Sequence, residues 1–299
     1  MTQRKIVAGG ILILWVGALG LLAQRELMPN EEKRRQAAAM LIEPGSFYYA
    51  VERGGDVLGY ASSQIDTSLL GVHIRSQIIT ERLDGPDSNR TPFQFEAFLS
   101  PQLRLRNYDI SSGRSPNQRQ LIARNVADTA LEMRSAHLRR PRLDTVPFSQ
   151  HAVTPELAPL LLAVGRALRA GDVHEVEIFD RSSRTVSRAA IRIEAESVFV
   201  VADSARWDAA SGLWAAARMD TVPAWRATIP GEGGGTVWFD RGGRVVLQDI
   251  GGGITLRRTA FELSFENWRS ARNLAAERGL DGAVEPPPPR PLGTTDRGG

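Results

Sequence analysis

The stretch TVSRAAIRIEAESVFVV, residues 185–201, carries the strongest strand signal of the chain. From Ala189 to Val201 every second residue is apolar or small, and Arg192, Glu194 and Glu196 stand among the intervening residues. Successive side chains of a β-strand point to opposite faces of its sheet. This period of two residues therefore predicts one long strand with one buried face.

Stretches on both sides of it show the same alternation, and glycine-containing turns separate many of them. The other predicted strands are Phe47–Arg53, Val57–Ser68, Val72–Thr80, Phe93–Ala97, Leu103–Arg106, Leu121–Asn125, Thr129–Ser135, Val173–Phe179, Val222–Ile229, Thr236–Asp240, Arg244–Ile250 and Ile254–Leu263. Tight turns such as Arg241-Gly242-Gly243 favour antiparallel pairing of neighbours. We therefore predict a mainly β fold, a long antiparallel meander curved into a half-barrel or a sandwich.

One helix is predicted to interrupt the strands between Thr154, a good cap, and Gly171, a good terminator. Its apolar face consists of Leu157, Leu160, Leu161, Val164 and Leu168. Pro159 is expected to delay or kink its start. Two interpretations remain open, a helix packed across the curved sheet and a lid over an apolar pocket. A second helix is predicted over Phe265–Arg278.

The amino terminus carries an uncharged run, Ile6–Ala23, behind Arg4 and Lys5. At about 1.5 Å per residue, a helix of this length just crosses a hydrocarbon core of about 30 Å. We predict a retained membrane anchor; a signal peptide cleaved near Ala18-Leu19-Gly20 is the alternative. The candidate residues for anchoring and helix packing are Gly9, Gly10, Trp15, Gly17 and Gly20, since the glycines allow partner helices to approach closely.

These features divide the chain into five parts. They are an anchor (1–27), a helical stalk (28–45), a first β-rich half (46–150), a helix with a second β-rich half and a closing helix (151–279), and a proline-rich tail (280–299). The tail is predicted to be an extended polyproline segment that binds a partner. Its candidate residues are Pro286, Pro287, Pro288, Pro289, Arg290 and Pro291.

Composition excludes several function classes. The chain of 299 residues has no cysteine, which removes disulfides, thiolate nucleophiles and Cys-ligated metals. Its net charge of +3 is small and spread along the sequence, so we expect no nucleic-acid partner. The densest basic cluster, Arg139, Arg140 and Arg142, is interpreted as a solvated loop.

Searches for catalytic patterns give nothing specific. The four histidines show no ligand spacing, no Gly-x-Ser-x-Gly elbow occurs, and the glycine runs at 231–235 and 251–253 lack the Lys-Ser/Thr of a phosphate loop. We therefore predict a protein that is not an enzyme, without catalytic, cofactor-binding or metal-ligating residues and without a cofactor.

The second half contains a series of strand and turn residues with a familiar order. It comprises Ile178-Phe179-Asp180, Ala195-Glu196-Ser197, residues 220–225 (DTVPAW), Val237-Trp238-Phe239-Asp240 and residues 255–262 (TLRRTAFE). About 155–270 resembles the β-rich extracytoplasmic region found ahead of transglutaminase-like domains in some bacterial membrane-anchored proteins. No cysteine nucleophile is present, so the resemblance implies the β-scaffold used without its enzyme.

Two functions remain open on these grounds. The first is a non-catalytic accessory or scaffolding subunit of a larger membrane-protein complex, for example respiratory, photosynthetic or envelope machinery. This subunit would be a single-pass protein of a bacterial inner membrane with most of the chain in the periplasm. The second is a periplasmic module that binds or carries a lipid or lipid-linked ligand between the curved sheet and the Leu157–Leu168 helix, since the meander with its apolar helix is similar in fold to periplasmic lipid carriers.

Overall fold

The computed structural model describes Trp15 and residues 31–81, 90–113, 118–137 and 140–277. The rest of the predicted anchor, with Gly9, Gly10, Gly17 and Gly20, and the tail from 280 to 299 lie outside these residues. Trp15 is helical and 64% exposed. Within the described residues, no helix combines the length and the apolar character that a membrane crossing needs.

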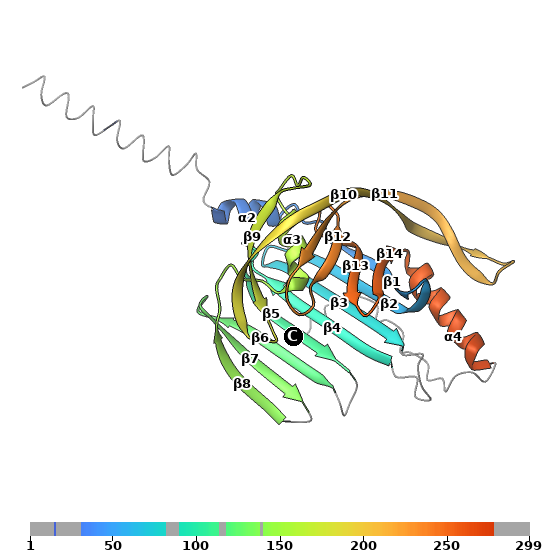
Figure 1. Cartoon of the computed structure of the whole chain (residues 1–299), viewed down its shortest axis with the longest axis horizontal. Coiled ribbons are helices and arrows are strands. Elements are labelled where there is room, and N and C mark those ends of the chain that lie inside the picture. Colours follow the sequence, from blue (N-terminus) through green and yellow to red (C-terminus); the bar gives the residue numbers. More distant parts are fainter. Residues whose placement is uncertain (1–14, 16–30, 82–89, 114–117, 138–139, 278–299) are drawn as a thin grey trace, which may run out of the picture.

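The described strands form one antiparallel sheet, which confirms the mainly β prediction (Figure 1). Its pairing order is β8-β7-β6-β5-β4-β3-β2-β1-β14-β13-β12-β11-β10-β9. The first half consists of β1 Gly45–Arg53, β2 Asp56–Ser68, β3 Gly71–Glu81, β4 Arg90–Leu99, β5 Leu105–Ser112, β6 Arg119–Val126, β7 Ala130–His137 and β8 Arg140–Pro147. The second half consists of β9 Val173–Asp180, β10 Thr185–Asp208, β11 Leu213–Ile229, β12 Gly235–Phe239, β13 Val245–Gly251 and β14 Ile254–Thr259.

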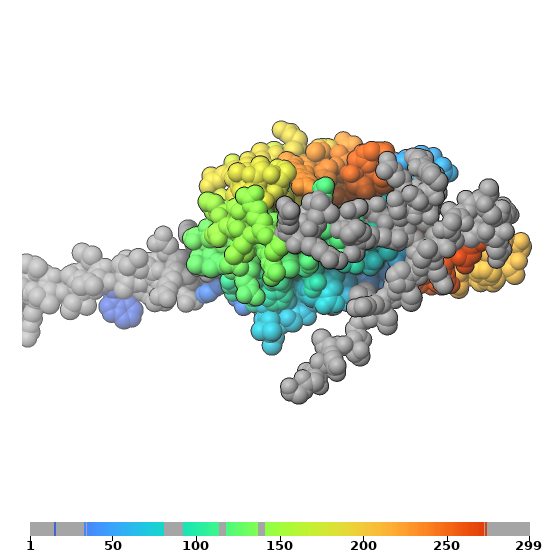
Figure 2. Space-filling model, turned by 90° about the horizontal axis from the view of Figure 1, so that it is seen from below, coloured from blue at the N-terminus to red at the C-terminus, as the bar shows by residue number. Residues whose placement is uncertain are grey.

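The sheet curls over on itself, so its two halves face each other across a shared core. Figure 2 shows the second half, yellow to orange, lying above the first half, cyan to green. The outer edges also approach each other, because Arg184 in the turn after β9 forms an ion pair with Asp144 of β8. On the connection between these edges, Val153 forms a parallel bridge with Ile178 of β9. One continuous core therefore contains residues of both halves.

Two segments of the first half differ from the sequence prediction. The solvated loop predicted at Arg139, Arg140 and Arg142 is wrong for the two described residues, since Arg140 and Arg142 belong to β8; Arg139 lies outside the described residues. Arg142 is exposed on this edge strand and pairs with Asp144 two residues on. The strand predicted over Leu103–Arg106 begins later, because Leu103 adopts a positive φ of 58° in the turn before β5.

β10 and β11 extend beyond the other strands as a hairpin, whose outer part (residues 198–223) we call the arm. β9 pairs only with residues 185–192 of β10, and β12 pairs only with Trp225–Ile229 of β11. The arm ends in the turn between β10 and β11, where Trp207 and Trp214 pack edge to face with ring centroids 5.7 Å apart. In Figure 1 the arm arches over the sheet toward helix α4 (Asn267–Glu277).

Asn267 at the start of α4 attaches the arm to the body. Its Oδ1 accepts from the Trp214 amide and its Nδ2 donates to the Trp214 carbonyl, both at 2.8 Å. We expect Asn267→Ala to raise hydrogen-exchange rates of the arm amides roughly tenfold, since each lost bond is worth about 1 kcal/mol. Amides of β3 and β4 serve as the internal control; equal acceleration there would indicate general destabilisation instead.

The predicted helix after Thr154 is short and mostly buried, with Glu156 and Leu161 partly exposed. It comprises a 3-10 turn, Pro155–Leu157, and helix α3, Ala158–Ala163. Pro159 lies in the first turn of α3, where a proline costs no helical hydrogen bond. The chain leaves the helix at Val164 and Gly165, so Leu168 lies outside it. Because the curled sheet surrounds α3, Leu162 is as fully buried as the predicted apolar face.

The flanking helices pack at different places. Helix α2, Glu31–Ala39, falls in the predicted stalk, and its buried end reaches the main core through Ala39 and Ile42. Next to α4, the π-helical turn η2 (Glu262–Glu266) packs outside the curl, where Phe265 and Trp268 form a second small core with Tyr60 and Ile79.

Candidate functional site

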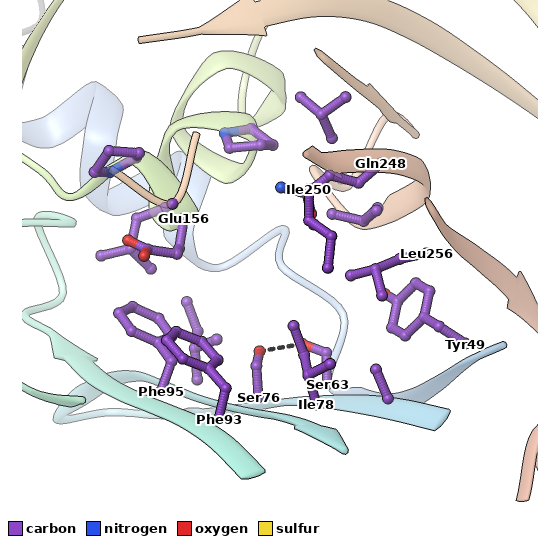
Figure 3. A pocket seen from close by; sticks show the side chains of 18 of the residues that line it. Tyr49, Ser63, Ser76, Ile78, Phe93, Phe95, Glu156, Gln248, Ile250 and Leu256 are labelled. Atoms are coloured by element: carbon purple, nitrogen blue, oxygen red, sulfur yellow. Dashed lines mark hydrogen bonds between the residues drawn. The ribbon is translucent and has the colours of Figure 1, made fainter. Parts of the chain in front are cut away.

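The interior of the curled sheet contains a cavity of about 470 Å³. Strands β1 to β4 form its floor and strands β11 to β14 its roof, with the segment Pro155–Leu160 at one end (Figure 3). Its volume corresponds to that of roughly fifteen molecules of liquid water at about 30 Å³ each. Protein interiors hold few voids larger than a single water, so this cavity is a built feature of the fold.

The register of the strands explains the floor. Phe47, Ser63, Ser76 and Phe95 are direct cross-strand partners in one row across β1 to β4. A neighbouring row contains Tyr49, Ala61, Ile78 and Phe93. Partners directly opposite in an antiparallel sheet share one face, so both rows point into the cavity.

The roof is built in the same way. Val237 of β12, Gln248 of β13 and Leu256 of β14 are cross-strand partners and form one row. Ile250 and Ile254 extend the apolar surface beside it. Gln248 is the one polar side chain of this roof row, and Figure 3 shows it facing the floor.

The cavity has a buried end and a more accessible end. Leu157, Phe95 and Ile229 are buried at one end, whereas Ile78, Thr80 and Phe93 are partly exposed at the other. A ligand can therefore enter past the partly exposed residues with little rearrangement of the buried end.

The helical segment is fixed to the roof by Gly243 in the β12–β13 turn. Gly243 has a φ of +73°, and a Cβ built on it would lie 2.8 Å from the Leu160 amide nitrogen and overlap its Cα. This contact brings Leu157 and Leu160 to the cavity wall. Of the other predicted apolar residues, Leu161 and Val164 pack against the core and Leu168 is buried in it.

An ion pair lies at the buried end. Arg181, just after β9, has a side chain only 6% exposed and pairs with Glu156 of the 3-10 turn. Its second nitrogen, Nη2, donates to the Glu232 carbonyl at 3.0 Å. The Oε2 atom of Glu156 is buried and has no hydrogen-bond partner among the described residues.

Serine hydroxyl groups make part of the otherwise apolar cavity floor polar. Ser76 Oγ donates to Ser63 Oγ at 3.0 Å on the floor. Outside the cavity lining, Tyr108 is fully buried near the Arg181–Glu156 ion pair, and burial raises the pKa of its hydroxyl well above the ordinary value, so the hydroxyl stays protonated. The nearby charges of Arg181, Glu156 and Glu232 have smaller, opposing effects on that pKa.

A second charged cluster borders the roof, and its groups are mutually satisfied. Asp240 is 3% exposed and accepts from the amides of Gly242 and Arg244, from Arg244 Nε at 2.8 Å and from Arg258 Nη1 at 3.1 Å. Both guanidinium groups also lie over the Phe47 ring, at 5.3 and 4.6 Å from its centroid. This arrangement fixes the β12–β13 turn, which in turn supports α3.

Comparison with known proteins adds no relative. No protein-family model, curated protein or solved structure matches this chain. Among the described residues, no group of three His, Asp or Glu side chains could hold a metal ion. The resemblance to the region that accompanies transglutaminase-like domains stays a prediction, and the cavity becomes the candidate site.

Sequence reasoning missed the polar groups of this site. Glu156 follows Thr154-Pro155, where an acidic residue is an ordinary first-turn residue of a helix, and Arg181 stands in a turn. A signal was present in β3, where Ser76 and Thr80 share a face with Val72, Ile74 and Ile78. Polar residues within an otherwise apolar strand face indicate a lining that is not fully packed.

Proposed function

We propose that this protein binds a lipid or another long apolar molecule inside the curled sheet, as a binding or carrier module. The observation that carries this proposal is the cavity of about 470 Å³ between floor, roof and α3. Small-molecule sites typically have volumes of about 300–1,000 Å³ and mostly apolar linings with a few polar groups. An empty apolar cavity of this size would cost stability, which an occupant restores.

Native mass spectrometry of the full chain, purified in mild detergent, tests this function. We expect one lipid-sized molecule to stay bound per chain after the detergent is removed, and organic extraction to identify it. Finding the full chain without any such bound molecule, both as purified and after incubation with a total lipid extract, would contradict the proposal.

We also propose a second function, an accessory subunit of a larger membrane-protein complex. The anchor sequence Ile6–Ala23 supports a single-pass position in a bacterial inner membrane with the body in the periplasm. The arm supports a partner surface, because Val198, Val200 and Met219 are 59%, 66% and 52% exposed on one of its faces. Exposed apolar side chains gathered on one surface favour a protein interface.

A native gel of the full chain in mild detergent tests this second function. We expect the wild-type chain to migrate with its partners and Val200→Lys to release it. Leu69→Lys is the matched control, since Leu69 is 92% exposed in the β2–β3 turn, far along the sheet from the arm. A wild-type chain that migrates as a lone monomer contradicts membership of a complex.

A further inference from the structure

The buried end of the cavity offers a hydrogen-bond acceptor that the protein itself does not use. The Oε1 atom of Glu156 pairs with Arg181, while its Oε2 atom is buried and has no hydrogen-bond partner in the described part of the chain. Leaving a buried charged acceptor unsatisfied is costly, more so than for a neutral group. A group that fills the cavity and donates a hydrogen bond at this point would remove that cost.

Both terminal nitrogens of Arg181 already donate to groups of the protein. One nitrogen faces Glu156, and the other donates to the Glu232 carbonyl at 3.0 Å and lies 4.0 Å from the Glu232 carboxylate. Arg181 and Glu156 neutralise each other, and the Glu232 carboxylate is 60% exposed, so solvent screens its charge. What this end of the cavity offers is an unpaired carboxylate oxygen, which accepts from a hydrogen-bond donor and disfavours a second anion.

The backbone of the β11–β12 loop packs directly against the Glu156–Arg181 ion pair. Gly233 lies so near that a Cβ there would overlap Glu156 Oε1 and lie 2.9 Å from Arg181 Nη2. Gly233 also has a φ of +88°, which side-chain-bearing residues rarely adopt. The loop between β11 and β12 thus covers the pair, and Glu156 itself lies in the cavity wall (Figure 3).

We propose, resting on the lipid-binding function above, that the ligand is a lipid with a neutral hydrogen-bond-donating head group, such as an alcohol or an amide. Its head group lies at the buried end and donates to Glu156 Oε2. Its apolar chain runs along the rows of Phe95 and Phe93 toward the partly exposed end of the cavity. Free fatty acids and phosphate-bearing lipids are disfavoured at this end.

A matched competition tests the head-group preference. The full chain is equilibrated in detergent at pH 8 with equimolar 1-hexadecanol and palmitate, and the bound fraction of each is measured by native mass spectrometry. A hydrogen bond to a charged partner is worth about 1.5–3 kcal/mol. We therefore expect hexadecanol to be preferred roughly ten- to a hundredfold.

The variant Glu156→Gln tests whether the Glu156 carboxylate causes the preference for hexadecanol over palmitate. Glutamine keeps the size of the side chain but is neutral and also donates, so we expect the preference to fall about tenfold. Glu232→Gln is the charge-matched control, because that carboxylate is 60% exposed, and it should leave the preference nearly unchanged. The wild-type ratio is informative even where the Glu156 variant fails to fold.

The outcomes separate the two proposals. If neither probe binds and no native lipid is found, the lipid-binding function itself fails. If both probes bind equally, or if palmitate binds better, the head-group inference is wrong while lipid binding stands. Equal binding would mean that a trapped water satisfies Glu156 Oε2 in place of the ligand.

Discussion

Ser76→Phe is expected to abolish ligand binding and to leave the fold intact. Ser76 lies in the middle of the cavity floor, between Ser63 and Phe95 in its cross-strand row. A phenyl ring at this position would occupy space that the ligand needs. Because the cavity has room for the ring, the usual penalty for overpacking a core does not apply.

The thermal stability of the ligand-free variant shows whether a loss of binding comes from a filled cavity or from an unfolded protein. Burying the phenyl ring contributes about 1.5–3 kcal/mol, and losing the hydrogen bond to Ser63 costs about 1 kcal/mol. We therefore expect Ser76→Phe to unfold at the same temperature as ligand-free wild type or at a higher one. The stabilisation that a bound lipid gives to wild type should be absent.

Ser111→Phe is the matched control. Ser111 lies on the outer face of β5, where its hydroxyl donates to Gln94 at 3.4 Å. The same substitution therefore adds a ring outside the cavity, and ligand binding should remain. If Ser76→Phe binds lipid as tightly as wild type does, the ligand lies elsewhere.

Gly243→Ala is expected to destabilise the protein by about 2–5 kcal/mol. The left-handed conformation at Gly243 costs a residue with a Cβ about 1–2 kcal/mol. The new methyl group also overlaps the backbone of Leu160, and backbone shifts of this kind typically cost about 1–3 kcal/mol. Denaturant unfolding followed by tryptophan fluorescence measures the sum.

Two other glycines separate these causes. Gly252 has a similar φ of +63° with open space around it, so Gly252→Ala carries the conformational cost alone. Gly242 lacks a positive φ, and its Cβ would meet only the flexible side chain of Arg244 and a carboxylate oxygen of Asp240. We expect the order Gly243, Gly252, Gly242 from most to least destabilising; an effect of Gly243→Ala no larger than that of Gly252→Ala would show that the turn does not hold α3.

The strands could be predicted from sequence because one face of each is exposed. In β10 the inward Ile191 and Ile193 are buried, whereas Arg192 and Glu194 lie on the other face. Such two-sided strands show the period of two residues directly. β8 was missed because its residues do not alternate between apolar and polar. Arg142 and Asp144 share a face with the buried Val146, whereas Leu143 on the other face is 64% exposed.

The helix and the outer hairpin were harder to predict for a different reason. Helix α3 is almost wholly buried, with only Leu161 partly exposed, so the period of its apolar residues does not define its ends; the helix stops at Ala163 rather than near Gly171. The arm segment Leu213–Thr221 has no buried face to mark it. Its pairing comes from β10, which only the tertiary structure provides.

The cavity itself has only a weak sequence signature. Its lining combines residues from eight strands, β1 to β4 and β11 to β14, and the helical segment, and their apposition depends on how strongly the sheet curls. Sequence placed Leu157 and Leu160 on an apolar face and Ser76 on an inward face. It did not bring Glu156 and Arg181 together, because they come from elements 25 residues apart that meet only after the sheet has closed.

The central position of the β1–β14 pair has a consequence for synthesis. Glu52 of β1 and Arg257 of β14 form an ion pair across this seam, although they are 205 residues apart in the chain. On the ribosome, the first eight strands therefore emerge long before β1 obtains its second neighbour. During that interval β1 is an exposed edge, which can pair with other chains. Correct folding thus requires β14, the last strand, to pair with β1, the first. Chains truncated before β14 should aggregate through the unpaired edge of β1.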